Sequence, residues 1–206
     1  MNKIKVLFIL PNLTAGGAQR VLSFLSNSLS TVHFESILLI IGYEKDSVYN
    51  YSHERTYFLN KKRTLSGVSS VIKFIWREKP DVVIGSIGQI NVLLGLLSIY
   101  FKKTRFIGRV TSVRTVNNQY SKANSNILLD KIYRFSDKKL SRIICQSEDM
   151  SNDLEKKFNI PKHSIRIINN PITTVPITIK IHNPIPNTIK LIMLGRLSQV
   201  EGHTRL

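Results

Sequence analysis

The sequence has little cysteine, little acid and no long apolar run. Cys145 is the one cysteine in 206 residues, so no disulfide can form within the chain. It lies in the apolar run RIIC, which favours a buried small side chain over a nucleophile. The most apolar segment, residues 90–101, is well short of the roughly 20 residues that cross a bilayer. The sequence therefore predicts neither a disulfide-stapled scaffold nor a membrane-spanning helix.

Two further features argue against secretion and against metal chemistry. The first apolar run, Val6–Leu10, ends at Pro11 and is too short for the hydrophobic region of a secretion signal, so we expect a cytoplasmic protein. The histidines are dispersed without the spacing of metal ligands. We therefore expect no metal and no cofactor on these five residues: His33, His53, His163, His182 and His203.

What the chain has in excess is positive charge. Lys and Arg number 30 against 13 Asp and Glu, which gives a formal net charge of +17. Such a balance suits nucleic acid, an anionic membrane surface or an anionic, lipid-linked substrate, and it can also reflect a general bias toward Lys, Asn and Ile. No RNA-binding, zinc-finger or helix-turn-helix pattern accompanies the scattered lysines, which disfavours nucleic acid. We expect an anionic membrane surface or a lipid-linked substrate, with compositional bias as the alternative.

Short apolar runs alternate with helical patterns along most of the chain. This alternation predicts an α/β fold: a doubly wound, mostly parallel Rossmann-like sheet with helices on both faces. Helices are expected after Gly17 and over residues 68–76, 91–100, 127–140 and 149–158, the last capped by Ser147 and the second stopped by Lys79-Pro80. The polar segment 44–52 is expected to be loop. The expected strands are Ile4–Leu10, Phe34–Ile41, Arg55–Leu59, Asp81–Ile84, Arg105–Val110, Arg142–Gln146 and Ser164–Ile168.

The alternation stops near Asn169 and a new strand begins at Ile189. Residues 173–187 are broken by prolines and have no helical period, which is typical of a linker. We therefore divide the chain into a domain over residues 1–172, a linker over 173–187 and the opening of a second domain over 188–206.

The best local motif is the first loop, NLTAGGAQR, over residues 12–20. A glycine pair between a buried strand and a helix lets the backbone approach a ligand, and the helix start offers free N–H groups to an anion. The loop is neither GxGxxG nor a Walker loop. Gly16 and Gly17 are thus candidates for ligand binding, with a purely structural turn as the alternative.

Five motifs in the same order resemble those of family-four retaining glycosyltransferases, which have the GT-B fold. Together they span the whole chain: GGAQR at Gly16–Arg20, KPDVVIGS at Lys79–Ser86, RIICQSEDM at Arg142–Met150, RIINNPI at Arg166–Ile172 and LIMLGRLSQVEGH at Leu191–His203. The resemblance implies an N-terminal, acceptor-side domain over residues 1–172. It also implies the first strand and loop of a C-terminal, donor-binding domain over residues 188–206.

The resemblance assigns roles to several of these residues. Gly16 and Gly17 would line the interdomain cleft near the donor diphosphate or the acceptor. Arg196 matches the arginine that contacts the diphosphate of the nucleotide sugar. Arg20 would be a supporting charge in the first helical turn, with a surface salt bridge as the alternative. Ser147 and Glu148 match a phrase of the family, but helix capping explains both adequately and is the favoured explanation.

The chain also departs from the family pattern. Gln19 stands where the family has an acid, and Glu201 stands where it has a lysine that binds the diphosphate. A carboxylate at that place would repel the donor. The paired-glutamate motif that holds the sugar is absent, and no catalytic residue can be named. Arg109 and Arg114 lie near the place of an acceptor-side histidine of some members but remain unassigned.

The resemblance implies an enzyme that moves a sugar from a nucleotide-sugar donor to a lipid-linked glycan acceptor during cell-surface polysaccharide synthesis. Such a protein would be cytoplasmic and peripheral at the inner face of the membrane, and this stretch alone would be inactive. A separate chain could supply the C-terminal domain. The alternative is a truncated, non-catalytic domain that binds a glycan lipid or a partner subunit.

Overall fold

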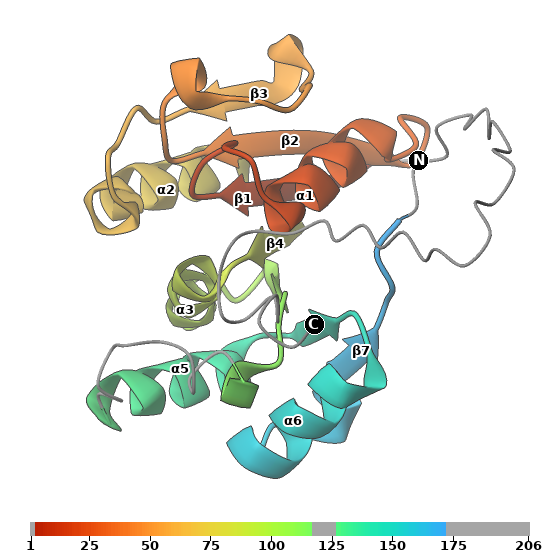
Figure 1. Ribbon diagram of the computed structural model, residues 1–206. Helices are drawn as coiled ribbons and strands as arrows, with labels where there is room; N and C mark the ends of the chain where they lie inside the picture. The colour runs from red at the N-terminus through yellow and green to blue at the C-terminus, as the bar shows by residue number, and fades with distance from the viewer. Residues whose placement is uncertain (1–2, 117–126, 172–206) are drawn as a thin grey trace, which may run out of the picture.

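The computed structural model describes residues 3–116 and 127–171, with the backbone alone at residues 53 and 127–130. Seven strands form one sheet in the order β3-β2-β1-β4-β5-β6-β7, and every neighbouring pair is parallel (Figure 1). The predicted doubly wound, Rossmann-like fold is confirmed. The strands are β1 Ile4–Leu10, β2 Phe34–Ile40, β3 Thr56–Phe58, β4 Val82–Ser86, β5 Arg105–Arg109, β6 Arg142–Cys145 and β7 Ile165–Ile167.

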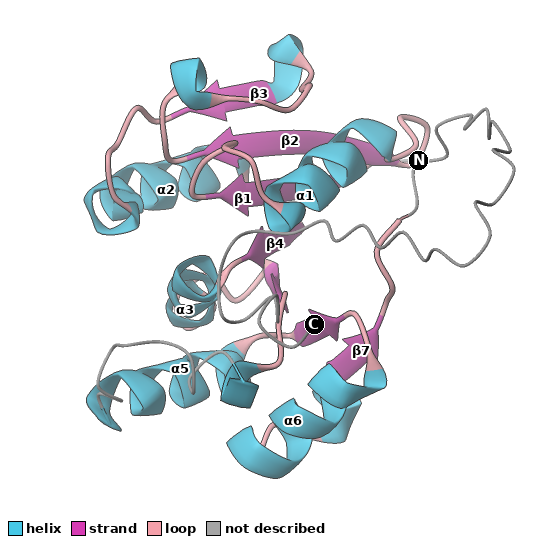
Figure 2. Ribbon diagram, in the orientation of Figure 1, coloured by secondary structure: helices cyan, strands magenta, loops and turns pink. Residues whose placement is uncertain are grey.

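Helices lie on both faces of this sheet, as predicted (Figure 2). The strands β1 and β2 send alternate side chains to opposite faces: Phe8 packs in one core cluster with Leu22 of α1, whereas Leu7 packs in the other with residues of α2, α3 and α6. The continuous apolar runs of these strands follow from burial on both sides. The helices are α1 Gly17–Ser28, α2 Thr64–Glu78, α3 Gly88–Leu97, α5 Ile127–Lys139 and α6 Glu148–Phe158.

In the described residues, three one-turn helices lie in two of the connections, two of them between β2 and β3 and one between α6 and β7. They are η1 Glu44–Asp46, η2 His53–Arg55 and η3 Lys162–Ser164. The segment 44–52, expected to be loop, therefore contains the turn η1. The predicted end of α2 is confirmed: Lys79 adopts the left-handed conformation with φ 47° and Pro80 follows, so the helix cannot continue.

The start of α3 was predicted too late. The apolar pattern indicated a helix from Asn91, but α3 begins at Gly88. Ile87 precedes it with φ 78° and ψ 138°, an unfavourable conformation for a β-branched residue. In the sequence, residues 86–89 (SIGQ) look like a loop. Glycine is a poor helix former, so Gly88 does not indicate the start of a helix.

Some expectations fall on parts of the chain outside the described residues. These expectations concern the linker over residues 173–187, the strand near Ile189, and the residues Arg196 and Glu201. The domain boundaries also stay predictions. Within the described ranges, no helix is both long and apolar enough to cross a membrane.

Candidate functional site

The connections at the carboxyl edge of the sheet form the candidate site. Strand β1 lies between β2 and β4, so the chain runs outward in opposite directions from this point. In open parallel sheets a crevice forms outside the carboxyl ends of the strands at such a switch point. The loop after β1 and the loops after β4 and β5 meet the solvent there. We call the segment Asn12–Arg20 the glycine turn and the segment Arg109–Val116 the arginine loop.

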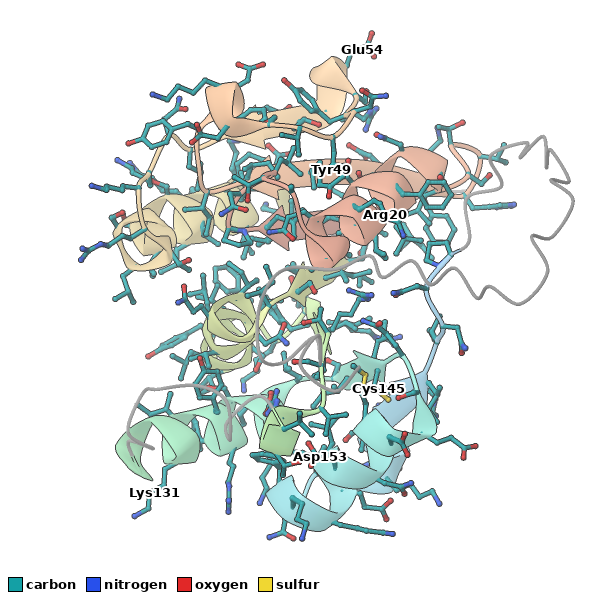
Figure 3. All side chains as sticks on the ribbon, viewed as in Figure 1. Arg20, Tyr49, Glu54, Lys131, Cys145 and Asp153 are labelled. Carbon is teal, nitrogen blue, oxygen red and sulfur yellow. The ribbon has the colours of Figure 1, made fainter. Side chains whose placement is uncertain are left out.

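Gly16 of the glycine turn is held by one side chain from a distant segment. The Tyr49 hydroxyl accepts a hydrogen bond from the Gly16 N–H at 2.8 Å and donates one to the Gly16 carbonyl oxygen at 3.0 Å. Tyr49 and Arg20 are labelled near α1 in Figure 3. Sequence reasoning missed Tyr49, because its segment has no regular pattern and nothing in it points to the turn.

A second set of hydrogen bonds fixes the start of the turn. Asn12 Oδ1 accepts from the Thr14 hydroxyl at 2.9 Å and from Gln19 Nε2 at 3.0 Å. Gln19 is 9% exposed, so its amide acts inside the turn and does not face solvent. The departure from the family acid at this position thus has a structural consequence: the amide donates a hydrogen bond that an ionised carboxylate could not.

The first turn of α1 has free donors and no negative charge. Gly16 at its N-cap offers no side-chain oxygen, and no acidic residue occupies the first turn. Initial N–H groups of a helix have no partner inside the helix, so they can bind an anion. Arg20 is exposed, and no carboxylate lies within ion-pair distance of it in the described part of the chain. The surface salt bridge that was the alternative for Arg20 is therefore not formed among these residues.

Gly17, the first residue of α1, has open space around it. A Cβ atom added there would meet no atom within 4 Å, whereas one added to Gly16 would collide with the Gln19 side chain. The two glycines thus differ in what they do. A Cβ atom on Gly16 would displace the Gln19 amide, whereas Gly17 leaves an uncovered stretch of backbone at the carboxyl edge of the sheet.

Arg109 ends β5 at the same edge and is 4% exposed. Its guanidinium donates to the Ser86 hydroxyl at 3.4 Å and to Asn170 Oδ1, and in the described ranges it meets no carboxylate. Burial lowers the pKa of the Arg109 guanidinium, but an arginine stays charged at neutral pH. Among the described residues, the carboxyl edge therefore contains a buried positive charge whose side-chain partners are neutral oxygens.

The rest of the arginine loop is held by two carboxylates, through an ion pair and through hydrogen bonds. Arg114 pairs with Asp137 of α5 through both guanidinium nitrogens, one of them at 3.1 Å from Oδ1. The Asp153 carboxylate of α6 accepts the N–H groups of Arg114 and Thr115 and, at 2.7 Å, the Thr115 hydroxyl. These bonds tie the loop to two helices, so Arg114 has a structural role here.

A cavity of about 340 Å³ lies between the arginine loop and the start of α3. Its polar lining includes Gln89, Asn91, Ser112 and Tyr133. Asn91 donates from Nδ2 to the Arg109 carbonyl at 3.1 Å, and its buried Oδ1 has no hydrogen-bond partner in the part of the chain that the structure describes. The lining can therefore both donate to and accept from a polar ligand.

Ser147 and Glu148 also lie at this edge, where α6 follows β6. The Ser147 hydroxyl accepts the Met150 N–H at 3.4 Å, so the predicted helix cap is confirmed. Glu148 opens α6, where a negative charge is favourable. The buried Cys145 is 0% exposed, and burial raises the pKa of its thiol, as expected of a packed side chain and not of a nucleophile.

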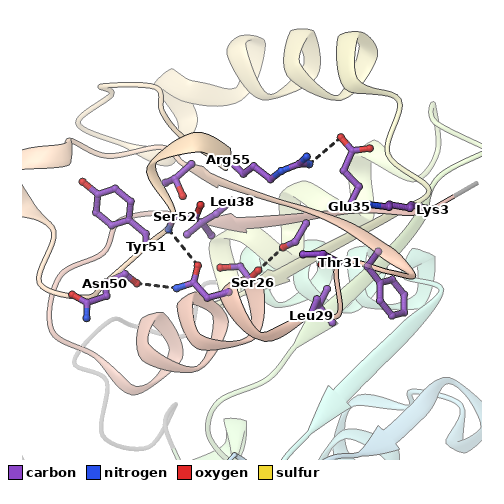
Figure 4. Close-up of a pocket in the computed structure, with 14 residues that line it drawn as sticks. Lys3, Ser26, Leu29, Thr31, Glu35, Leu38, Asn50, Tyr51, Ser52 and Arg55 are labelled. Carbon is purple, nitrogen blue, oxygen red and sulfur yellow. Dashed lines mark hydrogen bonds and ion pairs between the residues drawn. The ribbon is translucent and has the colours of Figure 1, made fainter.

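A larger hollow, of about 580 Å³, lies near the carboxyl-terminal end of α1 and not at this edge (Figure 4). Its polar groups bond one another: Asn27 Nδ2 donates to the Asn50 carbonyl at 3.2 Å, and Asn27 Oδ1 accepts the Ser52 N–H at 3.3 Å. Arg55 and Glu35 form an ion pair at 3.3 Å. Because these groups satisfy each other, the hollow is a weaker candidate than the carboxyl edge.

Known proteins bear on this geometry in three ways. The model of Glycosyltransferase Family 4 matches residues 15–175. No curated protein matches the sequence. Among solved structures, the apo lipopolysaccharide outer core galactosyltransferase WaaB is similar with a TM-score of 0.62 and 13% identity, over 84% of this chain and 48% of that one.

Two further solved structures have the same fold. HepE of Anabaena, in complex with UDP, has a TM-score of 0.59 and 12% identity, over 84% of this chain and 47% of that one. The UDP-GlcNAc 2-epimerase of Methanocaldococcus jannaschii has a TM-score of 0.56 and 15% identity, over 81% and 46%. The chain thus spans about half the length of these proteins.

The structural likenesses show the fold, and the sequence match shows the family. Transferases and an epimerase share this architecture, so fold alone does not separate them. The family model covers most of the chain, including residues 15–20 of the glycine turn and the whole arginine loop. This protein therefore belongs to glycosyltransferase family 4, and its described part has the fold of the N-terminal domain of a GT-B protein.

Proposed function

We propose that this chain is the acceptor-side half of a retaining glycosyltransferase. The enzyme would move a sugar from a nucleotide-sugar donor to a lipid-linked glycan acceptor during cell-surface polysaccharide synthesis. The observation that carries the proposal is the glycine turn at the β1–β4 switch point. There the uncovered backbone at Gly17 and the initial N–H groups of α1 lie at the carboxyl edge of the sheet, together with Arg20, which meets no carboxylate in the described ranges.

The chemistry of glycosyl transfer explains why such a surface is useful. A sugar leaves its donor as negative charge grows on a diphosphate, and donors that are already oriented stabilise that charge. Neutral N–H groups and one exposed guanidinium suit a phosphate-bearing donor or acceptor. A carboxylate in the first turn of α1 would oppose it, and none is there.

The second half of the site is expected from the segment after the described domain. We propose that residues 173–187 link to a donor-binding domain that opens at 188–206, where Arg196 would contact the donor diphosphate. Glu201 would stand beside that diphosphate in place of a lysine, which lowers the affinity expected for a donor. The site as a whole needs no metal or other cofactor in this proposal.

A binding experiment on the 206-residue chain tests the acceptor-side role. The probe is a short-chain isoprenyl diphosphate that carries one N-acetylglucosamine, titrated by calorimetry. Arg20→Gln removes the exposed cation of the turn and should weaken binding about tenfold, as loss of a charge-assisted hydrogen bond does. Arg142→Gln is the matched control, since Arg142 is exposed at the opposite end of its strand. No binding, or equal losses in both variants, would contradict the proposal.

A second measurement separates the enzyme from the non-catalytic alternative. The 206-residue chain alone should not hydrolyse UDP-sugars, and measurable turnover would show that the donor half is not required. Transfer should appear when residues 1–187 are joined to a complete donor-binding domain of the same family. If the joined protein binds the probe but transfers nothing, the chain is a binding domain for a glycan lipid or a partner subunit.

A further inference from the structure

The outer surface of α2, α3 and α5 carries an unusual set of exposed apolar side chains. These helices lie side by side on one face of the sheet, at the left of Figure 1. Trp76 is 73% exposed and Tyr100, in the turn after α3, is 80% exposed. We call this surface the three-helix face and define it by its exposed apolar residues: Leu65, Ile72, Trp76, Leu96, Tyr100 and Phe135.

The charges around these side chains are almost all positive. In residues 64–105 and 131–140 the cations are Lys73, Arg77, Lys79, Lys102, Lys103, Arg105, Lys131, Arg134, Lys138 and Lys139. Lys131 points away from the body of the protein in Figure 3. The carboxylates in the same stretches are three, and each already has a partner: Glu78 pairs with Arg77 and Lys5, Asp81 accepts the Lys5 N–H, and Asp137 pairs with Arg114.

Aromatic rings and lysines meet most closely between the ends of α2 and α3. A shallow hollow of about 390 Å³ there is lined by Trp76 and Tyr100 together with Lys79, Lys102 and Lys103. Trp and Tyr rings with one polar atom favour the boundary between lipid and water, and lysines beside them reach anionic headgroups. The hollow thus joins the two kinds of side chain that a charged bilayer surface attracts.

From this arrangement we infer that the three-helix face docks on an anionic lipid bilayer. A polyanion such as RNA would explain the lysines but not the exposed Leu65, Ile72 and Leu96, whereas a bilayer accommodates both. The face is a layer of helices and not a groove, which also suits a broad surface. The inference goes beyond the proposed glycosyl transfer, because it concerns where the chain docks and holds whether or not a sugar is moved.

The single tryptophan makes the inference directly measurable, because Trp76 is the only source of tryptophan fluorescence in the chain. Vesicles of phosphatidylcholine with about 30% phosphatidylglycerol should shift its emission to shorter wavelength, and pure phosphatidylcholine should not. At about 1 M salt, where the Debye length is about 3 Å, binding should fall sharply. No shift with the anionic vesicles at low salt would overturn the inference.

Matched variants locate the surface. Each lysine near an anionic membrane contributes about fivefold to binding, so Lys102→Glu with Lys103→Glu should weaken vesicle binding at least about 30-fold. The control is Lys156→Glu with Lys157→Glu, which makes the same charge change on α6 and should cost much less. Equal losses in the two pairs would mean that net charge alone binds the vesicles, and the three-helix face would not be the docking surface.

The apolar part is tested by co-sedimentation with the same vesicles. Trp76→Ser with Tyr100→Ser should lower binding about tenfold. Val32→Ser with Val48→Ser is the control, since these residues are 73% and 62% exposed elsewhere on the protein. All these side chains are exposed, and circular dichroism checks that the variants fold. If polyglutamate or duplex RNA competes with the vesicles and binds equally well without lipid, the face belongs to a polyanion and the inference fails.

Discussion

The glycine turn and the arginine loop lie at the same edge of the sheet but are built by opposite means. Neutral hydrogen bonds hold the glycine turn, from Tyr49 to Gly16 and from Gln19 to Asn12. Carboxylates hold the arginine loop: Asp137 forms an ion pair with Arg114, and Asp153 accepts hydrogen bonds from the loop backbone. Arg114 of the arginine loop is paired with a carboxylate, whereas Arg20 of the glycine turn meets none in the described ranges.

This difference separates the residues that shape the site from those that can meet a ligand. A guanidinium that is paired on both nitrogens has little attraction left for a phosphate. A free guanidinium beside helix N–H groups keeps that attraction. By this reasoning Arg20 is available to an anion, whereas Arg114 is a support. Arg109 is an intermediate case: it is buried, but in the described ranges its guanidinium bonds neutral oxygens and no carboxylate.

The largest effect is expected from breaking the ion pair of the arginine loop. Arg114→Met should lower the free energy of unfolding by about 3–5 kcal/mol, because it leaves the Asp137 carboxylate, 2% exposed, without its cation. Urea denaturation followed by circular dichroism measures this change. In the control, Arg114→Met is combined with Asp137→Leu, which removes both charges. The double variant should recover most of the loss, and a double variant as unstable as the single one would contradict this account.

A smaller effect is expected from giving the glycine turn the acid of its family. Gln19→Glu removes a donor from Asn12 Oδ1 and should cost about 1–2 kcal/mol near pH 7, partly offset by the favourable place of an acid in the first turn of α1. The protonated acid can donate again, so folding should raise the pKa of the introduced carboxyl. The deficit should therefore vanish below about pH 4 and return as pH rises.

The matched control for this variant is Gln89→Glu. The Gln89 amide oxygen accepts from the Thr64 hydroxyl at 3.3 Å, and a carboxylate can accept in the same way. Its stability at neutral pH should match that of the original protein. A Gln19→Glu protein that is as stable as the control at every pH would show that Asn12 turns its amide around and that the hydrogen bonds of the turn are interchangeable.

The sequence predicted the fold better than it predicted the site. Continuous apolar strands, the Ser147 cap and the stop at Lys79-Pro80 are local signals, and each is confirmed. The contacts that build the site are not local: Tyr49 reaches Gly16, and Arg114 reaches Asp137 and Asp153. No pattern in one sequence announces such pairings, because they depend on which loops the sheet brings together.

Removing the buried charge of Arg109 should have a modest effect on the free energy of unfolding. Arg109→Met removes the desolvation cost of a buried guanidinium that has no carboxylate partner in the described ranges. It also leaves Asn170 Oδ1 without the donor that Arg109 supplies. The two changes should cancel to within about 1 kcal/mol in the free energy of unfolding, in contrast to Arg114→Met. A loss as large as that of Arg114→Met would place Arg109 among the structural residues of the loop.

The smallest effect on stability, and of opposite sign, is expected at Gly17. Gly17→Ala introduces a Cβ into open space at the start of α1 and should raise the free energy of unfolding by up to about 1 kcal/mol, because alanine is the better helix former. The same methyl group covers backbone that a ligand would approach. Binding of the isoprenyl diphosphate sugar should therefore weaken while stability increases. Gly16→Ala, which collides with Gln19, should lose stability instead. If Gly17→Ala binds the probe as well as the original protein, the ligand does not approach this turn, and the arginine loop becomes the better candidate for the contact.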